Sequence, residues 1–463
     1  MEAIEEFDLV VVGGGKGGKS LAMDRAKAGA RVAMVERGMI GGSCINVACI
    51  PTKTLVTSAR AVGTIARAAK LGIRVDGSHV DLDLLRAHKE GVVGDMVKMN
   101  YDLFIASGMD FILGSARFTA PRTIEVTTDA GRTRLLRGTE VVINTGTRPI
   151  VPAIEGIDTV GVMTSEDVLR LESIPGRVAV IGGGYIGAEL AQMLHRFGSE
   201  LTMLVRGERL LAREEPEISQ ALAEVFTAEG IDVRFGAEAT QVARQDDGAI
   251  EITLGDTSRL TVDALVVATG REPVTEGLHL HEAGVETNAA GFVIVDEKLA
   301  TTAAHTWAAG DVAGHPQFTH VSFDDFRILK ANITGGDRST SGRLIPSVVF
   351  VEPEIATIGL TEADARAAGI DVVVAAQPVI AVPRSRTLRQ TKGLWKIVID
   401  RASDRIVGAS LMGAESGEVL AVIQVAMLAG APFTLLRDAI LAHPTMAEGL
   451  NTAFAGVTAS SAP

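Results

Sequence analysis

Two glycine-rich segments in matching register constrain the fold of this chain more than any other feature. Each follows an apolar run that is typical of a strand and precedes a helical pattern and a second apolar run. These runs are DLVVVGGG (8–15) with RVAMVE (31–36), and RVAVIGGG (177–184) with ELTMLV (200–205). Shifting the first copy by 169 positions superimposes Gly13, Gly15 and Gly18 on Gly182, Gly184 and Gly187. One such motif is weak evidence, but two in register predict two dinucleotide-binding units.

Within the first motif each glycine has a distinct expected role. Gly13 allows the tight turn, Gly15 lets the backbone approach a pyrophosphate, and Gly18 lets the helix pack on the strand. The helix then presents N–H groups and a partial positive charge to the phosphates. Glu36 ends the second strand, where its carboxylate can accept hydrogen bonds from a ribose.

The second motif differs from the first at the end of its second strand. The position that matches Glu36 is Val205, and Arg206 follows it. No carboxylate stands there to repel a 2′-phosphate, and a guanidinium is available to bind one. We therefore expect NADPH rather than NADH. A merely solvated Arg206 is the alternative.

Composition and charge narrow the class of protein. A chain of 463 residues suggests about three domains, and 47% hydrophobic residues with 50 glycines are typical of a soluble α/β protein. The net charge of −13 argues against nucleic acid or an anionic membrane as a partner. No apolar run reaches the roughly 18 residues of a membrane span, and the acidic start does not resemble a secretory signal. We expect a cytoplasmic protein.

The chain has two cysteines, Cys44 and Cys49, five positions apart. A short-range pair in a large, presumed cytosolic chain more often serves redox or metal chemistry than a structural role. Two ligands make a poor zinc site, so redox chemistry is favoured and no metal site is expected. On the first turns of one helix, the two thiols could form a disulfide, and the helix dipole would lower a thiolate's pKa. An inert buried pair is the alternative.

The remaining segments give coarser expectations. Residues 50–120 have a largely helical pattern, and an α+β domain is expected from about 340. Two apolar strands, in 141–149 and 266–273, end at Thr-Gly turns, so Gly146 and Gly270 are expected to line the cofactor sites. The basic run 382–393 is interpreted as a solvated hairpin, with an anionic-substrate rim as the alternative.

The segment GGSCINVACIPTK (41–53) resembles the signature of class I pyridine nucleotide–disulfide oxidoreductases, which include glutathione reductase, lipoamide dehydrogenase and mercuric reductase. The resemblance covers essentially the whole chain. Details such as GKGGKSLA and HPTMAEGLN are most similar to bacterial reactive-chlorine-resistance and mercuric-reductase-like members. The family fold is α/β, with two Rossmann-like domains for FAD and NAD(P) and a C-terminal α+β dimerisation domain. The implied boundaries are 1–148 and 267–338 for the FAD domain, 149–266 for the NAD(P) domain and 339–463 for the interface domain.

The resemblance also implies residue roles. Cys49 would contact the flavin and form a charge-transfer complex with it, and Cys44 would be the interchange thiol that meets the acceptor. Lys53 would lie near the flavin and pair with Glu189. Tyr185 would cover the nicotinamide pocket, and Asp311 would bind the ribityl chain of the flavin. His443 would be the acid/base for the cysteine pair, oriented by Glu448.

The implied activity is an FAD-dependent reductase that passes electrons from NADPH through the cysteine pair to a disulfide, quinone or metal ion. Mercuric reductases carry an additional C-terminal cysteine pair and tend to have tyrosine at the position of His443, so dedicated mercury reduction is disfavoured; a mercuric-reductase-like or Cu(II) reductase is kept as an alternative. A flavin-binding regulatory protein with vestigial catalysis is the alternative of another class. Because His443 would enter the partner's site, a homodimer with shared active sites is expected.

Overall fold

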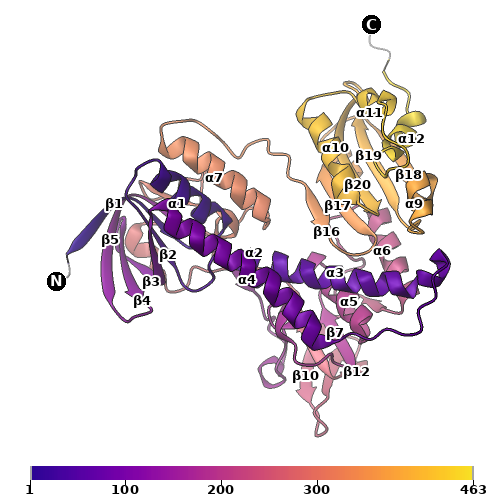
Figure 1. Cartoon of the computed structure of the whole chain (residues 1–463), viewed down its shortest axis with the longest axis horizontal. Helices are drawn as coiled ribbons and strands as arrows, with labels where there is room; N and C mark the ends of the chain where they lie inside the picture. Colours follow the sequence, from indigo (N-terminus) through magenta and orange to yellow (C-terminus); the bar gives the residue numbers. More distant parts are fainter. Residues whose placement is uncertain (1–2, 461–463) are drawn as a thin grey trace. The chain divides into compact units, whose positions relative to one another are not determined.

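The computed structural model describes residues 3–460, which fold into two compact units (Figure 1). The first unit comprises the residues up to Thr54 together with Arg86–Ile150 and Gly270–Arg343. The second comprises Leu55–Leu85, Val151–Thr269 and the residues from Leu344 onward. The chain changes unit near the three expected boundaries, but it also does so around Leu55–Leu85. The second unit contains both the second glycine motif and the C-terminal region, so the division into three domains stays a prediction.

The first unit is built on a six-stranded mixed sheet. Its first strand, β1, pairs in parallel with β2 and with β5, and β5 pairs in parallel with β15. Val10 and Val11 of β1 are fully buried, because this strand has side chains packed on both faces. The strands are β1 (Ile4–Val12), β2 (Val32–Glu36), β3 (Asp110–Ala120), β4 (Thr123–Thr128), β5 (Thr133–Ile143) and β15 (Thr306–Ala308).

Helices cover one face of this sheet. α1 packs against α7, and residues of both join strand residues in one apolar core that includes Leu21, Phe104 and Ile328. A separate two-stranded pairing joins β6 to β14. The remaining elements of this unit are α1 (Lys16–Lys27), α2 (Ser43–Asn46), η4 (Leu280–Ala283), η5 (Gly310–Ala313), α7 (Thr319–Ile333), β6 (Thr147–Pro149) and β14 (Arg271–Pro273). Two long helices contribute residues to both units: α3 (Cys49–Ala66) and α4 (Leu82–Ser107).

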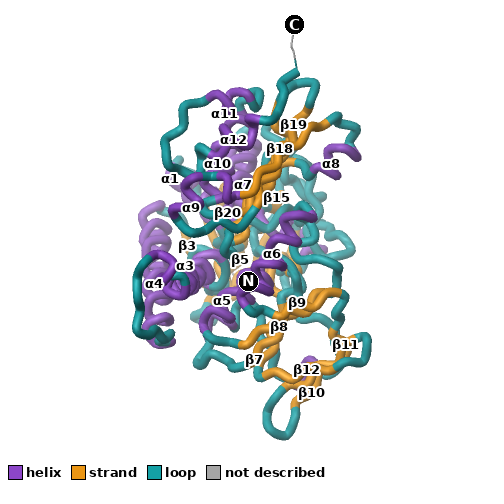
Figure 2. Tube along the Cα trace, turned by 90° about the vertical axis from the view of Figure 1, so that its right-hand side faces the viewer, coloured by secondary structure: helices purple, strands orange, loops and turns teal. Residues whose placement is uncertain are grey.

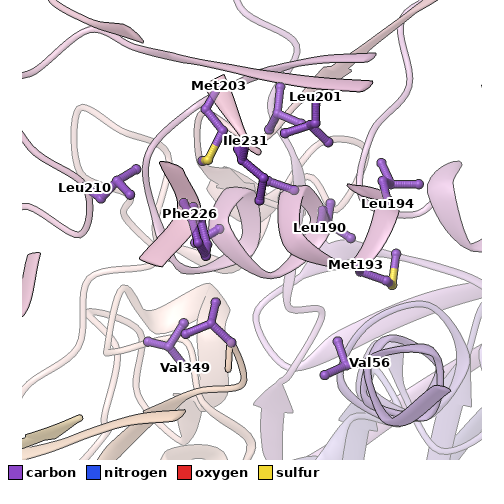
Figure 3. Packing of buried hydrophobic residues seen from close by; sticks show 14 of the residues in the cluster. Val56, Leu190, Met193, Leu194, Leu201, Met203, Leu210, Phe226, Ile231 and Val349 are labelled. Carbon is purple, nitrogen blue, oxygen red and sulfur yellow. The ribbon is translucent and has the colours of Figure 1, made fainter. Parts of the chain in front are cut away.

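The second unit contains a four-stranded parallel sheet around the second glycine motif. The order is β13-β7-β8-β9, and a separate antiparallel sheet follows the order β10-β11-β12. Leu190, Phe226 and Val349 belong to one buried apolar cluster of this unit (Figure 3). The elements are β7 (Arg177–Ile181), α5 (Tyr185–Phe197), β8 (Glu200–Val205), α6 (Pro216–Glu229), β9 (Asp232–Phe235), β10 (Ala239–Arg244), β11 (Ile250–Leu254), β12 (Arg259–Val262) and β13 (Ala264–Val267), with η1 (Ala68–Leu71), η2 (Ile157–Thr159) and η3 (Val168–Arg170) between them.

The C-terminal part of this unit is a five-stranded antiparallel sheet in the order β16-β17-β20-β19-β18. Figure 2 shows β18, β19 and β20 with helices of the same region around them, and α10 packs on β17 and β20. Trp395 is fully buried in the apolar core of this region. The elements are β16 (Ser347–Val349), β17 (Glu354–Gly359), α8 (Glu362–Ala367), β18 (Val372–Pro378), η6 (Val379–Ala381), α9 (Pro383–Thr387), β19 (Leu394–Asp400), β20 (Arg405–Gly413), α10 (Ser416–Leu428), α11 (Thr434–Asp438) and α12 (Gly449–Ala455).

The mixed α/β fold with a C-terminal α+β region agrees with the sequence prediction. Residues 50–120 are largely helical as expected, except that 110–120 form β3, which pairs with β2 and β4. The run 382–393 lies in the connection between β18 and β19, which pair as antiparallel strands, so it is part of a hairpin as expected. This connection contains the short helix α9, and Pro383 occupies its first turn, where the missing N–H costs nothing.

Candidate redox and nucleotide sites

The first glycine motif forms a tight turn at the end of β1. Gly13 has φ +101°, and a Cβ there would lie 2.3 Å from the backbone oxygen of Asn144. A Cβ on Gly18 would lie 2.6 Å from the oxygen of Gly13, so only glycine lets α1 pack this closely. Gly15 is the N-cap residue of α1, and a Cβ there would lie 2.8 Å from Asn144 Oδ1. These close approaches explain why glycine is favoured at all three positions.

Glu36 organises the backbone around this turn. Its Oε2 accepts a hydrogen bond from the Gly14 N–H at 2.7 Å, and its Oε1 accepts from the N–H groups of Gly38 and Met39, both at 2.9 Å. The side chain is 9% exposed. Glu36 therefore fixes the glycine loop from the next strand, in addition to the expected ribose contact, which stays a prediction.

The residues around this turn fit a flavin dinucleotide. The N–H groups of Gly15 and Lys16 have no hydrogen-bond partner within residues 3–460, so the start of α1 can still receive a phosphate. Asp311 accepts a hydrogen bond from the Thr147 hydroxyl at 3.0 Å, and burial raises the pKa of its carboxyl. A Cβ on Gly146, with φ +71°, would meet no atom within 4 Å, which leaves open space beside Thr147.

The second glycine motif repeats this arrangement in the second unit. Gly182 has φ +127°, and a Cβ there would lie 2.4 Å from the Ala268 oxygen. A Cβ on Gly184 would meet no atom within 4 Å, and α5 begins without a side-chain cap. Arg206 follows the end of β8 and is exposed. Open space at a helix N-terminus and an exposed guanidinium are suited to the pyrophosphate and 2′-phosphate of a nicotinamide dinucleotide.

Tyr185, the first residue of α5, is held by a buried carboxylate that the sequence did not single out. Its hydroxyl donates to Glu214, which is 4% exposed. Burial and the Glu214 charge raise the pKa of Tyr185, and burial also raises the pKa of Glu214. The hydrogen bond to Glu214 thus fixes the position of the Tyr185 ring.

The two cysteines lie together in the first unit. Both are half-buried thiols. A hydrogen bond with Cys49, followed by burial, raises the pKa of Cys44. The Cys49 Sγ lies 3.6 Å from the hydroxyl of Thr319, at the start of α7. The two sulfurs are close enough to exchange electrons as a dithiol–disulfide couple.

The two cysteines do not share one helix, which was the condition for the expected dipole effect on both thiols. Cys44 lies in the short helix α2, and Cys49 is the first residue of α3. The backbone leaves helical geometry at Val47, with φ −141°, and a new helix starts two residues later. The helix dipole of α3 therefore acts on Cys49, at its N-terminus, rather than equally on both thiols.

The other expected catalytic residues are divided between the two units. Lys53 lies in the first unit on α3, and Glu189 lies in the second on α5, so their pairing stays a prediction. Glu189 is 5% exposed and accepts a hydrogen bond from the Phe350 N–H at 2.9 Å. Gly270 ends the loop before β14, with φ +144°.

His443 and Glu448 are close together in the second unit. The His443 Nδ1 lies 2.8 Å from Glu448 Oε2. The imidazole is 69% exposed, whereas the carboxylate is 14% exposed. A carboxylate at Nδ1 fixes the ring and leaves Nε2 available for proton transfer. The geometry suits an acid/base dyad, and its catalytic use stays a prediction.

Sequence reasoning did not single out Thr319, Glu214 or Lys19. Thr319 and Glu214 lie far along the chain from Cys49 and Tyr185, and no local pattern connects them. Lys19 could have been found, because a lysine three positions before Ala22 lies on the apolar stripe of its helix.

Comparison with known proteins places this geometry in a family. Residues 7–325 match the pyridine nucleotide-disulphide oxidoreductase family, and residues 345–454 match its dimerisation domain. The chain belongs to this family. It is 37% identical over 457 residues to the probable pyridine nucleotide-disulfide oxidoreductase RclA of Escherichia coli K12, covering 97% of this chain and 99% of that protein. It is also 37% identical over 453 residues to a mercuric reductase of Staphylococcus aureus, covering 97% of this chain and 82% of that protein.

Solved structures of this family have the same fold. The HOCl-induced flavoprotein disulfide reductase RclA from Escherichia coli superimposes with a TM-score of 0.89 at 37% identity, covering 97% of this chain and 100% of that one. A structure of its Cu(II) complex gives the same values. The predicted family and fold are therefore confirmed. Members of this family are flavoprotein oxidoreductases that use FAD and NAD(P)H, and the chain carries their dimerisation domain.

No group of three or more His, Cys, Asp or Glu side chains in residues 3–460 could hold a metal ion. Within the same residues no helix is long and apolar enough to cross a membrane.

Proposed function

We propose that this protein is an FAD-dependent, NADPH-driven reductase that delivers electrons through the Cys44–Cys49 pair to a disulfide acceptor. The observation that carries the proposal is the hydrogen-bonded pair of half-buried thiols at the junction of α2 and α3. It lies in the same unit as a glycine turn and buried carboxylates suited to a flavin dinucleotide. When bound, FAD supplies two-electron transfer between nicotinamide and disulfide.

The protein's residues carry the thiol chemistry. In the reduced pair, the Cys44 thiolate attacks one sulfur of the acceptor disulfide, whose S–S bond breaks and releases a thiolate. Cys49 then attacks the Cys44 sulfur, which re-forms the protein disulfide and releases the second thiolate. Thr319 contributes a hydroxyl at 3.6 Å from the Cys49 sulfur. Each cycle consumes NADPH and one proton, and yields NADP⁺ and two thiols.

The two leaving thiolates need protons, and His443 is proposed to supply them. Its contact with Glu448 leaves the second ring nitrogen of an exposed imidazole available. We propose that His443 acts on the cysteine pair of the partner subunit, so that the homodimer has two shared active sites.

We propose that the protein uses NADPH in preference to NADH. Arg206 is exposed directly after β8, and the neighbouring strand-end residue, Val205, carries no charge. A guanidinium there favours a nucleotide with a 2′-phosphate.

A metal-ion acceptor is the second candidate. The observation in its favour is that a 37%-identical relative, RclA of Escherichia coli, has been solved as a Cu(II) complex. In that case two electrons from the dithiol would reduce two Cu(II) ions to Cu(I). A turnover screen with oxidised glutathione, lipoamide, quinones, Cu(II) and Hg(II) ranks these acceptors.

Anaerobic absorbance spectra of two variants test the proposal. Cys44→Ser and Cys49→Ser should both lose acceptor reduction, since each removes one half of the disulfide. Cys44→Ser alone should show long-wavelength absorbance from a thiolate beside the flavin without any reductant. In the unsubstituted protein, NADPH should generate the same absorbance.

Two outcomes would overturn parts of this proposal. If the Cys49→Ser protein, and not the Cys44→Ser protein, shows the long-wavelength absorbance, the roles assigned to the two thiols would be reversed. Full flavin reduction by NADPH, with acceptor turnover unaffected in both variants, would remove the cysteine pair from the pathway.

A further inference from the structure

A buried lysine lies beneath the segment that leads to Cys44. Lys19 is on the inward face of α1 and is 5% exposed. Its Nζ donates to the Gly41 carbonyl at 3.0 Å and to Asn100 Oδ1 at 2.7 Å. The Asn100 amide is held in this orientation, because its Nδ2 donates to the Met96 carbonyl at 2.7 Å.

The loop above Lys19 fits tightly against it. Gly41 and Gly42 have φ +90° and +87°. A Cβ on Gly42 would lie 2.7 Å from the Gly15 Cα, and a Cβ on Gly41 would lie 3.4 Å from Lys19 Nζ. The segment is thus fixed between the glycine turn on one side and the lysine on the other. Cys44 follows two residues later.

Both hydrogen-bond partners of Lys19 are uncharged, so its charge is not needed for these two bonds. A buried ammonium is costly, and a neutral donor could make the same contacts. Of the charged groups that act on it, Lys16 disfavours the ammonium, whereas the Cys44 thiolate favours it. The effect is reciprocal, because Lys19 lowers the pKa of Cys44 against the opposing effects of Cys49 and burial.

We propose that Lys19 is a positioning residue that holds the Gly41–Ser43 segment through the Gly41 carbonyl and, by its charge, favours the thiolate form of Cys44 against the opposing effects of Cys49 and burial. This rests on the proposed role of Cys44. Reduction of the disulfide creates the anion that the ammonium is placed to meet. Burial lowers the pKa of Lys19 to about 8, so the lysine is mostly charged at pH 7 and loses its charge above pH 8.

The titratable groups that act on this arrangement come from three elements. They are Lys16 and Lys19 on α1, Cys44 on α2 and Cys49 on α3. The neighbouring helices α4 and α7 contribute the uncharged Asn100 and Thr319.

Alkylation of the flavin-loaded protein by iodoacetamide tests the proposal without NADPH or an acceptor. Because the chain has two cysteines, a Cys49→Ser background leaves Cys44 as the single thiol. In this background Lys19→Met and Lys19→Gln should each lower the alkylation rate at pH 7 by about tenfold, the effect of a one-unit rise in thiol pKa. Lys19→Arg should stay within about threefold of the parent, since it keeps the charge.

Lys27→Met is the matched control, because Lys27 is an exposed lysine on the last turn of the same helix. It should leave the rate within about twofold of the parent. A parent-like rate in Lys19→Gln would show that only hydrogen bonding matters, and would overturn the proposal. The proposal would also be overturned if Cys44 is alkylated slowly in the Cys49→Ser parent and every Lys19 substitution leaves that rate unchanged.

If Lys19→Met and Lys19→Gln lose their flavin, the pH dependence of alkylation in the parent and in Lys19→Arg tests the proposal instead. The pH profile of alkylation in the parent should show an inflection near pH 8, where Lys19 loses its proton. Lys19→Arg should lack it, because arginine stays charged. Identical profiles would overturn the proposal. Since none of these measurements involves turnover, they remain valid whether or not a disulfide is the acceptor.

Discussion

Replacing Lys396 by methionine should destabilise the second unit by about 3–5 kcal/mol. Lys396 lies on β19 with its side chain 6% exposed. Its Nζ is 3.0 Å from Glu215 Oε2 and 2.9 Å from both Glu217 Oε1 and Glu362 Oε2. The lysine therefore joins the C-terminal sheet to two carboxylates at the start of α6 and to one on α8.

The magnitude is determined mainly by Glu215. This carboxylate is 3% exposed and would remain buried without its cation. Opposite charges about 4 Å apart attract by roughly 4 kcal/mol at an effective dielectric constant of about 20. Glu217 is 52% exposed, so its own contribution is below about 1 kcal/mol. The Glu362 N–H, which donates to Glu215 Oε1 at 2.6 Å, still satisfies one carboxylate oxygen.

The effect should depend on pH with a definite sign. The hydrogen bond from Lys396 lowers the pKa of Glu362. Burial is the largest single effect on Glu217 and raises its pKa, but the Lys396 hydrogen bond, a backbone hydrogen bond and the Lys396 charge together lower that pKa. A carboxylate with a lowered native pKa adds stability above its ordinary value of 4.5, and this is lost as the pH falls through the native pKa. The difference between parent and Lys396→Met should be largest near pH 7 and shrink below pH 4.5.

Urea unfolding followed by tryptophan fluorescence measures this difference. The chain has two tryptophans, and Trp395 is fully buried in the second unit, so a Trp307→Phe background reports that unit alone. Glu217→Gln, which removes the most exposed carboxylate of the cluster, should cost less than about 1 kcal/mol. A loss below about 1 kcal/mol in Lys396→Met, or one independent of pH, would refute the reasoning.

Three further predictions concern the nucleotide and active sites. Arg206→Ala should raise the KM for NADPH by about tenfold and leave that for NADH nearly unchanged; steady-state kinetics showing a tenfold native preference for NADH would contradict this. Glu36→Gln should weaken FAD binding by about tenfold or more, since one acceptor of the loop N–H groups becomes a donor; flavin released during gel filtration measures the loss, and complete retention would exclude the role. Mixing Cys44→Ser with His443→Ala subunits should restore activity toward half, because each heterodimer contains one intact shared site. No recovery despite demonstrated subunit exchange would mean that each chain completes its own site.

Local sequence patterns were enough to predict the two dinucleotide-binding units. A glycine with positive φ at Gly13 and Gly182 is required by backbone sterics alone, so the two turns can be read without tertiary information. The apolar strands on either side alternate with helices at lengths that permit a parallel sheet. The cysteine signature likewise pointed to the redox pair, because its residues are adjacent in the chain.

Other features depended on packing between distant segments. The strand at 110–120 pairs with β2 and β4, and that pairing overrides the helical appearance of the region. Cys44 and Cys49 lie on two helices because the backbone turns at Val47 between them. Hydrogen bonds that span the chain, such as Cys49 with Thr319, have no signature in sequence spacing.

The buried charges show this division most clearly. The family resemblance proposed roles for Lys53, Glu189 and His443, and the place of Arg206 directly after the second strand of the second glycine motif indicated its role. The sequence could not assign Glu214, because whether a glutamate is solvated or enclosed depends on which segments fold over it. The sequence gives the type of each ionisable side chain. Its pKa depends on burial and on the distance to other charges, and both are properties of the folded chain.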